Sequence, residues 1–209
     1  MTGTVRIDLV DGIARLVLDA PPSNELDVDR LAELARIVRE ELPRLDARGL
    51  VVCGSGRHFS SGANVPQLEA VFRSDPAGAA RLVEDHSAAL SGIEHLPVPT
   101  VAAIAGACLG AALELALACR FRVAARRATL ALPEASFGLM PGLGGIARLT
   151  SLCGRARAID LVLTGRPVGA DEALELGLVD AVVERGALLE AAEALVRVAD
   201  RPGTEAAAR

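Results

Sequence analysis

The stretch over residues 98–119 constrains the fold most, because it is almost entirely apolar yet contains one carboxylate, Glu114. Its length approaches that of a membrane-spanning helix, and Gly106 and Gly110 form a GxxxG pair. However, prolines interrupt its start, and an ionised carboxylate would cost about 3 kcal/mol inside a bilayer. We therefore predict a buried strand over residues 100–104, a turn at 105–106 and a buried helix from about residue 110.

Glu114 and Glu134 are the two carboxylates that stand in otherwise apolar sequence. Glu114 lies between Ala-Ala-Leu and Leu-Ala-Leu-Ala, and Glu134 follows Leu-Ala-Leu-Pro. Burial of an ionised carboxylate without a partner is costly and usually raises its pKa. If the two groups met, repulsion would raise one pKa further and give an acid and a base near neutral pH. Spacing alone does not bring them together, and each could instead face solvent or pair with an arginine, the candidates being Arg120, Arg122 and Arg148.

The composition excludes several classes of function. Hydrophobic residues make up 51% of the 209 residues, so the chain can bury a core, and we expect one domain over residues 1–209. The net charge is −5 with no basic run, which argues against nucleic acid as a partner. All 22 basic residues are arginine, so Schiff-base chemistry, a Ser–Lys dyad and a P-loop are excluded.

The cysteine and histidine patterns predict neither a metal site nor a disulfide framework. Four cysteines lie far apart, and the three histidines form no metal-binding pair. The first six residues lack an apolar signal region, so we expect a cytoplasmic protein with no membrane contact.

Alternating strand and helix patterns predict an α/β fold. Val5–Val10 and Ile13–Leu18 alternate around Asp11-Gly12, which is typical of a hairpin. Further strands are expected at residues 49–53, 100–104, 121–125, 129–132 and 178–183. Helices are expected at residues 31–42, 77–92, 110–118, from 145 onward, 155–163, 171–175 and 187–199.

Two glycine-rich loops invite an anion-binding interpretation. The segment Gly142-Leu143-Gly144-Gly145 could hold an anion through its N–H groups, but it follows a proline rather than a strand, which favours a tight turn before a helix. Residues 54–63 lack the ending of a Walker motif.

Four segments together carry a family resemblance. Residues 59–64, 105–116, 133–145 and 160–180 resemble the enoyl-CoA hydratase/isomerase (crotonase) superfamily in order and spacing. The resemblance extends from the first hairpin to about Glu184. It implies a ClpP/crotonase-like α/β spiral of repeated ββα units with surrounding helices. It also implies a homo-oligomer, trimer or hexamer, that acts on acyl-CoA or another acyl thioester. No cofactor is implied, because coenzyme A is part of the substrate.

The same resemblance implies site residues. The backbone N–H groups of Ala63 and Ala111 would form an oxyanion hole, and Glu114 and Glu134 match the catalytic pair of the hydratase branch. That branch adds water in syn geometry across a trans-2-enoyl thioester. Glu134 would then assist proton transfer to the α-carbon, while Glu114 orients and activates the water. Substrate-binding positions implied at the same motifs are Ser61, Asn64, Val65, Gly110 and Arg57.

The sequence departs from the family pattern in four places. Asn64 stands where aspartate is common, and Ala111-Ala112 replaces a glycine pair, which would narrow the acyl entrance. Lysines that often contact CoA phosphate are absent, which leaves Arg57 or another arginine to do so, or a different thioester carrier. The chain stops at Arg209, before the helices that usually close the pocket and build the trimer. An isomerase, decarboxylase or thioester hydrolase, or a non-catalytic partner subunit, is therefore the alternative.

Overall fold

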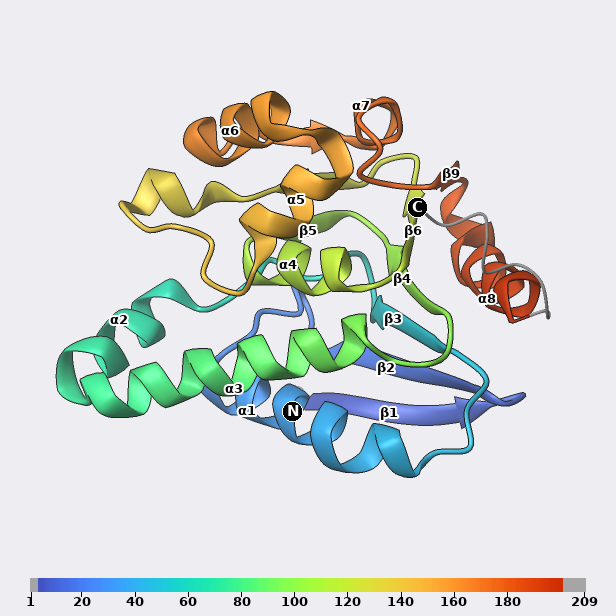
Figure 1. The fold of residues 1–209 in the computed structure, drawn as a ribbon, viewed down its shortest axis with the longest axis horizontal. Helices are drawn as coiled ribbons and strands as arrows, with labels where there is room; N and C mark the ends of the chain where they lie inside the picture. Colours follow the sequence, from blue (N-terminus) through green and yellow to red (C-terminus); the bar gives the residue numbers. More distant parts are fainter. Residues whose placement is uncertain (1–3, 201–209) are drawn as a thin grey trace.

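The computed structural model describes residues 4–200, which form two sheets surrounded by helices (Figure 1). The larger sheet has six strands in the order β1-β2-β3-β4-β6-β9, and the smaller has the order β5-β7-β8. The strands of the larger sheet are β1 (Thr4–Val10), β2 (Ile13–Asp19), β3 (Leu50–Gly54), β4 (Thr100–Ile104), β6 (Phe121–Ala125) and β9 (Ala181–Val183). Those of the smaller sheet are β5 (Ala107–Leu109), β7 (Thr129–Ala131) and β8 (Val168–Gly169).

Helices connect the strands and cover the sheets. The α-helices are α1 (Val28–Arg36), α2 (Val65–Ser74), α3 (Pro76–Glu94), α4 (Ala111–Ala118), α5 (Gly145–Cys153), α6 (Arg155–Thr164), α7 (Ala170–Glu175) and α8 (Leu188–Ala199). A π-helical segment η1 (Ile37–Glu41) and a 3-10 turn η2 (Leu42–Arg44) extend α1. Two further 3-10 turns are η3 (Pro133–Phe137) and η4 (Arg185–Ala187).

The middle of the chain repeats one ββα unit. In β4-β5-α4, the first strand joins the larger sheet and the second joins the smaller sheet, and β6-β7 followed by η3 and α5 repeats this division. The pairs β4–β6 and β5–β7 are both parallel, so successive units advance in the same direction. This repetition is the spiral of ββα units that the family resemblance implies.

The central parallel strands are buried on both faces. In β4, Ala102 and Ile104 belong to the core under α1, α3 and α4, whereas Val101 and Ala103 belong to the core under α8. Strand side chains alternate between faces, so a continuous apolar strand needs cover on both sides. Figure 1 shows α3 and α8 on different sides of these strands.

Most of the predicted elements are present, including the hairpin and the strand, turn and helix over residues 98–119. None of the helices within residues 4–200 is long and apolar enough to cross a membrane. The pattern missed α2, β5 and β8. Val65, Leu68 and Phe72 of α2 recur at helical spacing, so this helix could have been read from the sequence, whereas β5 and β8 are too short for alternation to reveal. The last strand begins at Ala181 rather than at residue 178, because the Leu178 N–H bonds back to Ala173 in α7.

A buried asparagine ties the segment after β2 to the loop after β3. Asn24 is 0% exposed and adopts a left-handed backbone (φ 53°), which asparagine tolerates better than most residues. Its Oδ1 accepts from the Ala20 N–H at 3.0 Å, and its Nδ2 donates to the carbonyls of Ser55 and His58, each at 2.8 Å. The loop held in this way continues to Ala63.

We predict that Asn24→Ala lowers the free energy of unfolding by about 3 kcal/mol, because it leaves several buried backbone groups without partners. Urea denaturation measures the loss. The matched control is Asn64→Ala, which removes a helix cap from α2 and should cost only about 1 kcal/mol. Equal stability of the Asn24→Ala variant and the unsubstituted protein would contradict this role for Asn24.

Candidate active site

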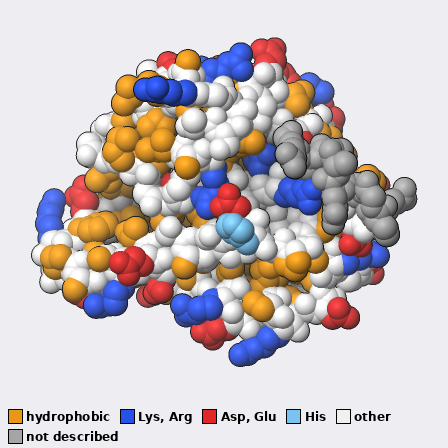
Figure 2. Space-filling view, viewed as in Figure 1, with side chains coloured by type: hydrophobic (Ala, Val, Ile, Leu, Met, Phe, Trp, Pro, Cys, Tyr) orange, Lys and Arg blue, Asp and Glu red, His pale blue; other side chains and the backbone are white. Residues whose placement is uncertain are grey.

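A cavity of about 600 Å³ lies between α2, α3, the start of α4 and the segment that follows β7. Most of its lining is apolar, and its polar groups come chiefly from residues 61–63, 110–114 and 134. Figure 2 shows hydrophobic side chains gathered on the side of the molecule where α2 and the segment 133–142 lie. The apolar wall consists of Leu31, Val65, Pro66, Leu68, Phe72, Leu82, Val83, Leu109, Pro133, Phe137, Leu139, Met140 and Leu143.

The N–H of Ala63 is open because of the way this residue pairs with Leu26. In this parallel bridge, Leu26 bonds to the carbonyl of Gly62 at 2.8 Å and to the N–H of Asn64 at 2.9 Å. Successive N–H groups of an extended chain point in opposite directions, so the Ala63 N–H points away from Leu26. It has no acceptor within residues 4–200, and Ala63 lines the cavity.

The N–H of Ala111 is open because this residue begins α4, and the first N–H groups of a helix have no partner within it. Gly62 brings the Ala63 segment against this helix start: a Cβ on Gly62 would lie 2.4 Å from the Leu109 carbonyl oxygen and 3.7 Å from the Ala111 nitrogen. Only glycine fits there, and its φ of +89° also favours glycine. Two open N–H groups therefore lie on adjacent segments of the cavity wall.

Glu114 lies one turn into α4 and is 2% exposed. Its Oε1 accepts two backbone hydrogen bonds, from the N–H of Leu143 at 2.8 Å and from that of Gly145 at 2.9 Å. Burial raises its pKa, while these two bonds and the positive charge of Arg148 act in the opposite direction. Burial is the largest of these effects, so the pKa of Glu114 is raised overall, while the two hydrogen bonds and Arg148 offset part of the cost of its carboxylate form.

Glu134 lies in η3 and has no such support. Its Oε2 is buried and has no hydrogen-bond partner within the described chain. Burial raises its pKa to about 7, and the negative charge of Glu114 adds to the increase. Its Oε1 is 3.1 Å from the position that a Cβ on Gly110 would take, so Glu134 reaches the start of α4. Glu134 is therefore partly protonated near neutral pH, whereas Glu114 has hydrogen-bond donors for its anion.

This arrangement can perform acid–base chemistry beside a bound carbonyl group. One carboxyl group has donors for its anionic form, a second retains a proton, and two open N–H groups could stabilise negative charge on an oxygen. No group of three or more His, Cys, Asp or Glu side chains within residues 4–200 could hold a metal ion.

The structure brings together most, but not all, of the residues that the sequence indicated. Ser61, Val65 and Gly110 line the cavity with Ala63, Ala111 and the two glutamates. Asn64 does not: it caps α2 and donates to Glu25 at 2.8 Å. Arg57 is exposed and outside the cavity lining, so its contact with CoA stays a prediction.

The turn over residues 142–145 combines its two interpretations. It is the tight turn before α5 that the sequence favoured, and its N–H groups also bind an anion, namely the protein's own Glu114. Glu114 forms no direct ion pair with Arg120, Arg122 or Arg148 within the described residues. This answers the alternative for Glu114 that its spacing had left open.

Sequence reasoning missed most of the apolar wall, and it indicated an anion site at residues 142–145 without identifying Glu114 as the anion. Pro66 beside Asn64 was a usable sign of a helix start, because proline favours the first helical positions. The glycines around Leu143 were a sign of open N–H groups, but main-chain donors do not show which anion they bind.

Residues 8–208 match the family model for enoyl-CoA hydratase/isomerase. Three solved structures illustrate the similarity. An enoyl-CoA hydratase from Bacillus anthracis is 33% identical, over 93% of this chain and 75% of that chain, with a TM-score of 0.82. An enoyl-CoA hydratase from Polaromonas sp. JS666 is 30% identical, over 95% and 77%, with a TM-score of 0.85. A provisionally named enoyl-CoA hydratase from Thermobifida fusca YX, solved with acetoacetyl-CoA, is 31% identical, over 95% and 81%, with a TM-score of 0.86.

The family model spans nearly the whole chain, and the TM-scores of 0.82 and 0.85 show that these structures share its fold. The chain therefore has the crotonase fold and belongs to the enoyl-CoA hydratase/isomerase family.

Proposed function

We propose that this protein is a hydro-lyase that adds water in syn geometry across the double bond of a trans-2-enoyl thioester. The observation that carries the proposal is the pair Glu114 and Glu134, which face one cavity in two different electrostatic environments. Hydration requires both a proton acceptor for water and a proton donor for carbon. The raised pKa of Glu134 and the hydrogen-bonded carboxylate of Glu114 suit these two tasks.

In the proposed reaction, the thioester oxygen accepts hydrogen bonds from the N–H groups of Ala63 and Ala111. These donors stabilise the enolate that forms, and such donors contribute roughly 3–4 kcal/mol each in comparable sites. Water attacks the β-carbon while the Glu114 carboxylate takes its proton, and Glu134 gives its proton to the α-carbon. The product has a hydroxyl on one carbon and a hydrogen on the other. Proton exchange then restores both carboxyl groups.

The cavity favours an acyl thioester as substrate. Its apolar wall suits an acyl chain, and a relative of this chain binds acetoacetyl-CoA. CoA enters as part of the substrate, so the proposal includes no separate cofactor. An arginine, with Arg57 as our candidate, would contact the CoA phosphates in place of lysine. Phe72, Phe137 and Met140 are exposed at the cavity lining, which favours a trimeric or hexameric assembly in which another copy covers them.

We predict that Glu114→Gln and Glu134→Gln each lower the hydration rate of crotonyl-CoA by about 10³-fold, because general acid and base catalysis contribute on this order. Both variants should retain the far-UV circular dichroism spectrum and the cooperative thermal unfolding of the unsubstituted protein. Chromatography of the product identifies 3-hydroxybutyryl-CoA. Unchanged turnover in either variant would refute its assigned role, and release of free CoA without a hydroxyacyl product would indicate a thioester hydrolase instead.

A further prediction concerns the pH dependence of hydration. Hydration needs Glu134 protonated, and its pKa is about 7, so kcat/KM should fall tenfold per pH unit above this range. It should also fall at low pH, where Glu114 becomes protonated. Because glutamine does not titrate, Glu134→Gln should abolish the alkaline decline in the residual activity. A decline that persists in this variant would assign the proton to another group.

Another prediction concerns Gly145, which donates to Glu114. A Cβ there would lie 2.8 Å from Glu114 Oε1 and 2.7 Å from its Cγ, so Gly145→Ala must displace the carboxylate. We expect kcat to fall by about 10²-fold, consistent with the sensitivity of catalysis to small misplacements. The matched control is Gly169→Ala, because nothing lies within 4 Å of a Cβ at Gly169. Similar activity of the two variants would contradict the role of this turn.

A further inference from the structure

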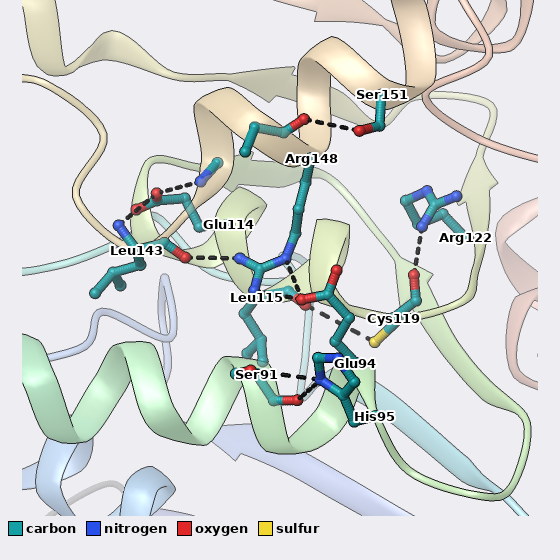
Figure 3. A network of polar contacts seen from close by, with 12 residues as sticks. Ser91, Glu94, His95, Glu114, Leu115, Cys119, Arg122, Leu143, Arg148 and Ser151 are labelled. Carbon is teal, nitrogen blue, oxygen red and sulfur yellow. Dashed lines mark hydrogen bonds and ion pairs between the residues drawn. The ribbon is translucent and has the colours of Figure 1, made fainter.

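An ion pair outside the catalytic cavity contacts the turn that holds Glu114. Arg148 in α5 donates from Nη1 to the Leu143 carbonyl at 2.6 Å, and from Nε and Nη2 to Glu94 Oε2 at 3.1 and 2.8 Å (Figure 3). The Arg148 side chain is only 12% exposed, so this is not a loose surface pair. Neither Arg148 nor Glu94 lines the catalytic cavity, so neither could touch substrate there.

Arg148 and Glu114 bind the same turn, Glu114 through N–H groups and Arg148 through carbonyl groups. The Leu143 N–H donates to Glu114 while its carbonyl accepts from Arg148, and the Gly144 carbonyl accepts from the Arg148 backbone N–H at 3.1 Å. A Cβ on Gly144 would lie 2.7 Å from Arg148 Nη1, so the guanidinium lies directly against the turn. The positions of the two N–H donors to Glu114 are therefore coupled to Arg148.

Glu94 fixes Arg148 from another part of the chain. It is the last residue of α3, and it lies with Arg148 in a second cavity of about 460 Å³ at the C-terminal end of α4. Because one carboxylate oxygen accepts from both Nε and Nη2, the guanidinium plane is held in one orientation. The structure thus forms a chain of contacts from α3 through α5 to the catalytic carboxylate.

We propose that Arg148, oriented by Glu94, is a positioning residue that fixes the Leu143–Gly145 turn and keeps Glu114 as the ionised base of the reaction. The role as base rests on the proposed function, whereas the coupling of Arg148 to the Glu114 carboxylate does not. Arg148 acts in two ways: it orders two hydrogen-bond donors, and its positive charge favours the carboxylate.

Other charged and titratable groups surround Glu114. Glu134 from η3, Glu25 from the segment before α1, and His86 from α3 line the same cavity. Burial lowers the pKa of His86, so it is neutral near pH 7, and Glu134 is the carboxyl group whose pKa the charge of Glu114 raises. Arg148 from α5 is the group whose positive charge lowers the pKa of Glu114. Its removal should consequently raise that pKa.

The experiment compares Arg148→Met, Arg148→Lys and Glu94→Gln with the control Arg120→Met, which removes an arginine from the second cavity without touching the turn. In Arg148→Met we expect a loss of at least 10-fold in kcat. The acidic limb of the kcat/KM profile should move to higher pH by about one unit, which is the low end of the shift that a nearby opposite charge produces. Arg148→Lys and Glu94→Gln both keep a positive charge at position 148. They should lower kcat, but they should move the acidic limb less than Arg148→Met does.

A second readout does not require turnover. Carboxyl carbons of ¹³C-labelled glutamate report protonation by NMR, and the Glu114 signal is the one that disappears in Glu114→Gln. Its titration should move upward in Arg148→Met and stay in place in Arg120→Met. If Arg148→Met fails to fold, Glu94→Gln should still lower kcat more than Arg120→Met does, and equal rates in these two variants would refute the proposal.

The outcomes separate the two claims. A shifted acidic limb and a shifted NMR titration support the positioning role, whereas a lower kcat with both unmoved means that Arg148 serves only the packing of α5. Absence of hydration in the unsubstituted protein would refute the proposed function, but a shifted NMR titration would still establish the coupling. An unmoved Glu114 titration in folded Arg148→Met would refute the coupling of Arg148 to Glu114.

Discussion

Burial of the Glu114 carboxylate is the constraint on which the rest of the site depends. A buried carboxylate is tolerated only where hydrogen bonds or an opposite charge compensate for lost hydration. Here the compensation comes from two backbone N–H groups of a glycine-containing turn, with Arg148 behind that turn. Glu134 has only a hydrogen bond to its own backbone, its Oε2 has no partner within the described chain, and burial raises its pKa to about 7. The difference between two chemically identical side chains thus arises from the segments around them.

The two carboxylates could be found in the residue pattern, but that they act as a pair was implied only by the family resemblance. Each was conspicuous as a single charge in apolar surroundings, which is a local property of the sequence. Their convergence depends on the ββα repeat, in which α4 and η3 follow strands that pair in parallel in the smaller sheet. The hairpin was predictable from its alternation, and the central strands were predictable as short, continuous apolar runs. Helix α2 carries Val65, Leu68 and Phe72 at helical spacing, but these side chains line the cavity and none of them is buried in the core.

Backbone groups explain most of what the sequence did not reveal. The open N–H groups at Ala63 and Ala111 were inferred from family resemblance alone, because a main-chain donor leaves no side-chain signature. The structure gives each a physical origin: a parallel bridge that uses the neighbouring residues, and the start of a helix. The contacts of Leu143, Gly144 and Gly145 are likewise made by the main chain. Alanine in place of the usual glycine at position 111 leaves its N–H open.

A crystal structure with a bound, unreactive acyl-CoA tests the central claim most directly, because that claim concerns the position of one oxygen atom. The account predicts that the thioester oxygen lies within about 3 Å of both the Ala63 and Ala111 nitrogens. It also predicts one water molecule in contact with both glutamates beside the β-carbon. A thioester bound elsewhere, or two carboxyl groups too far apart to share that water, would contradict it.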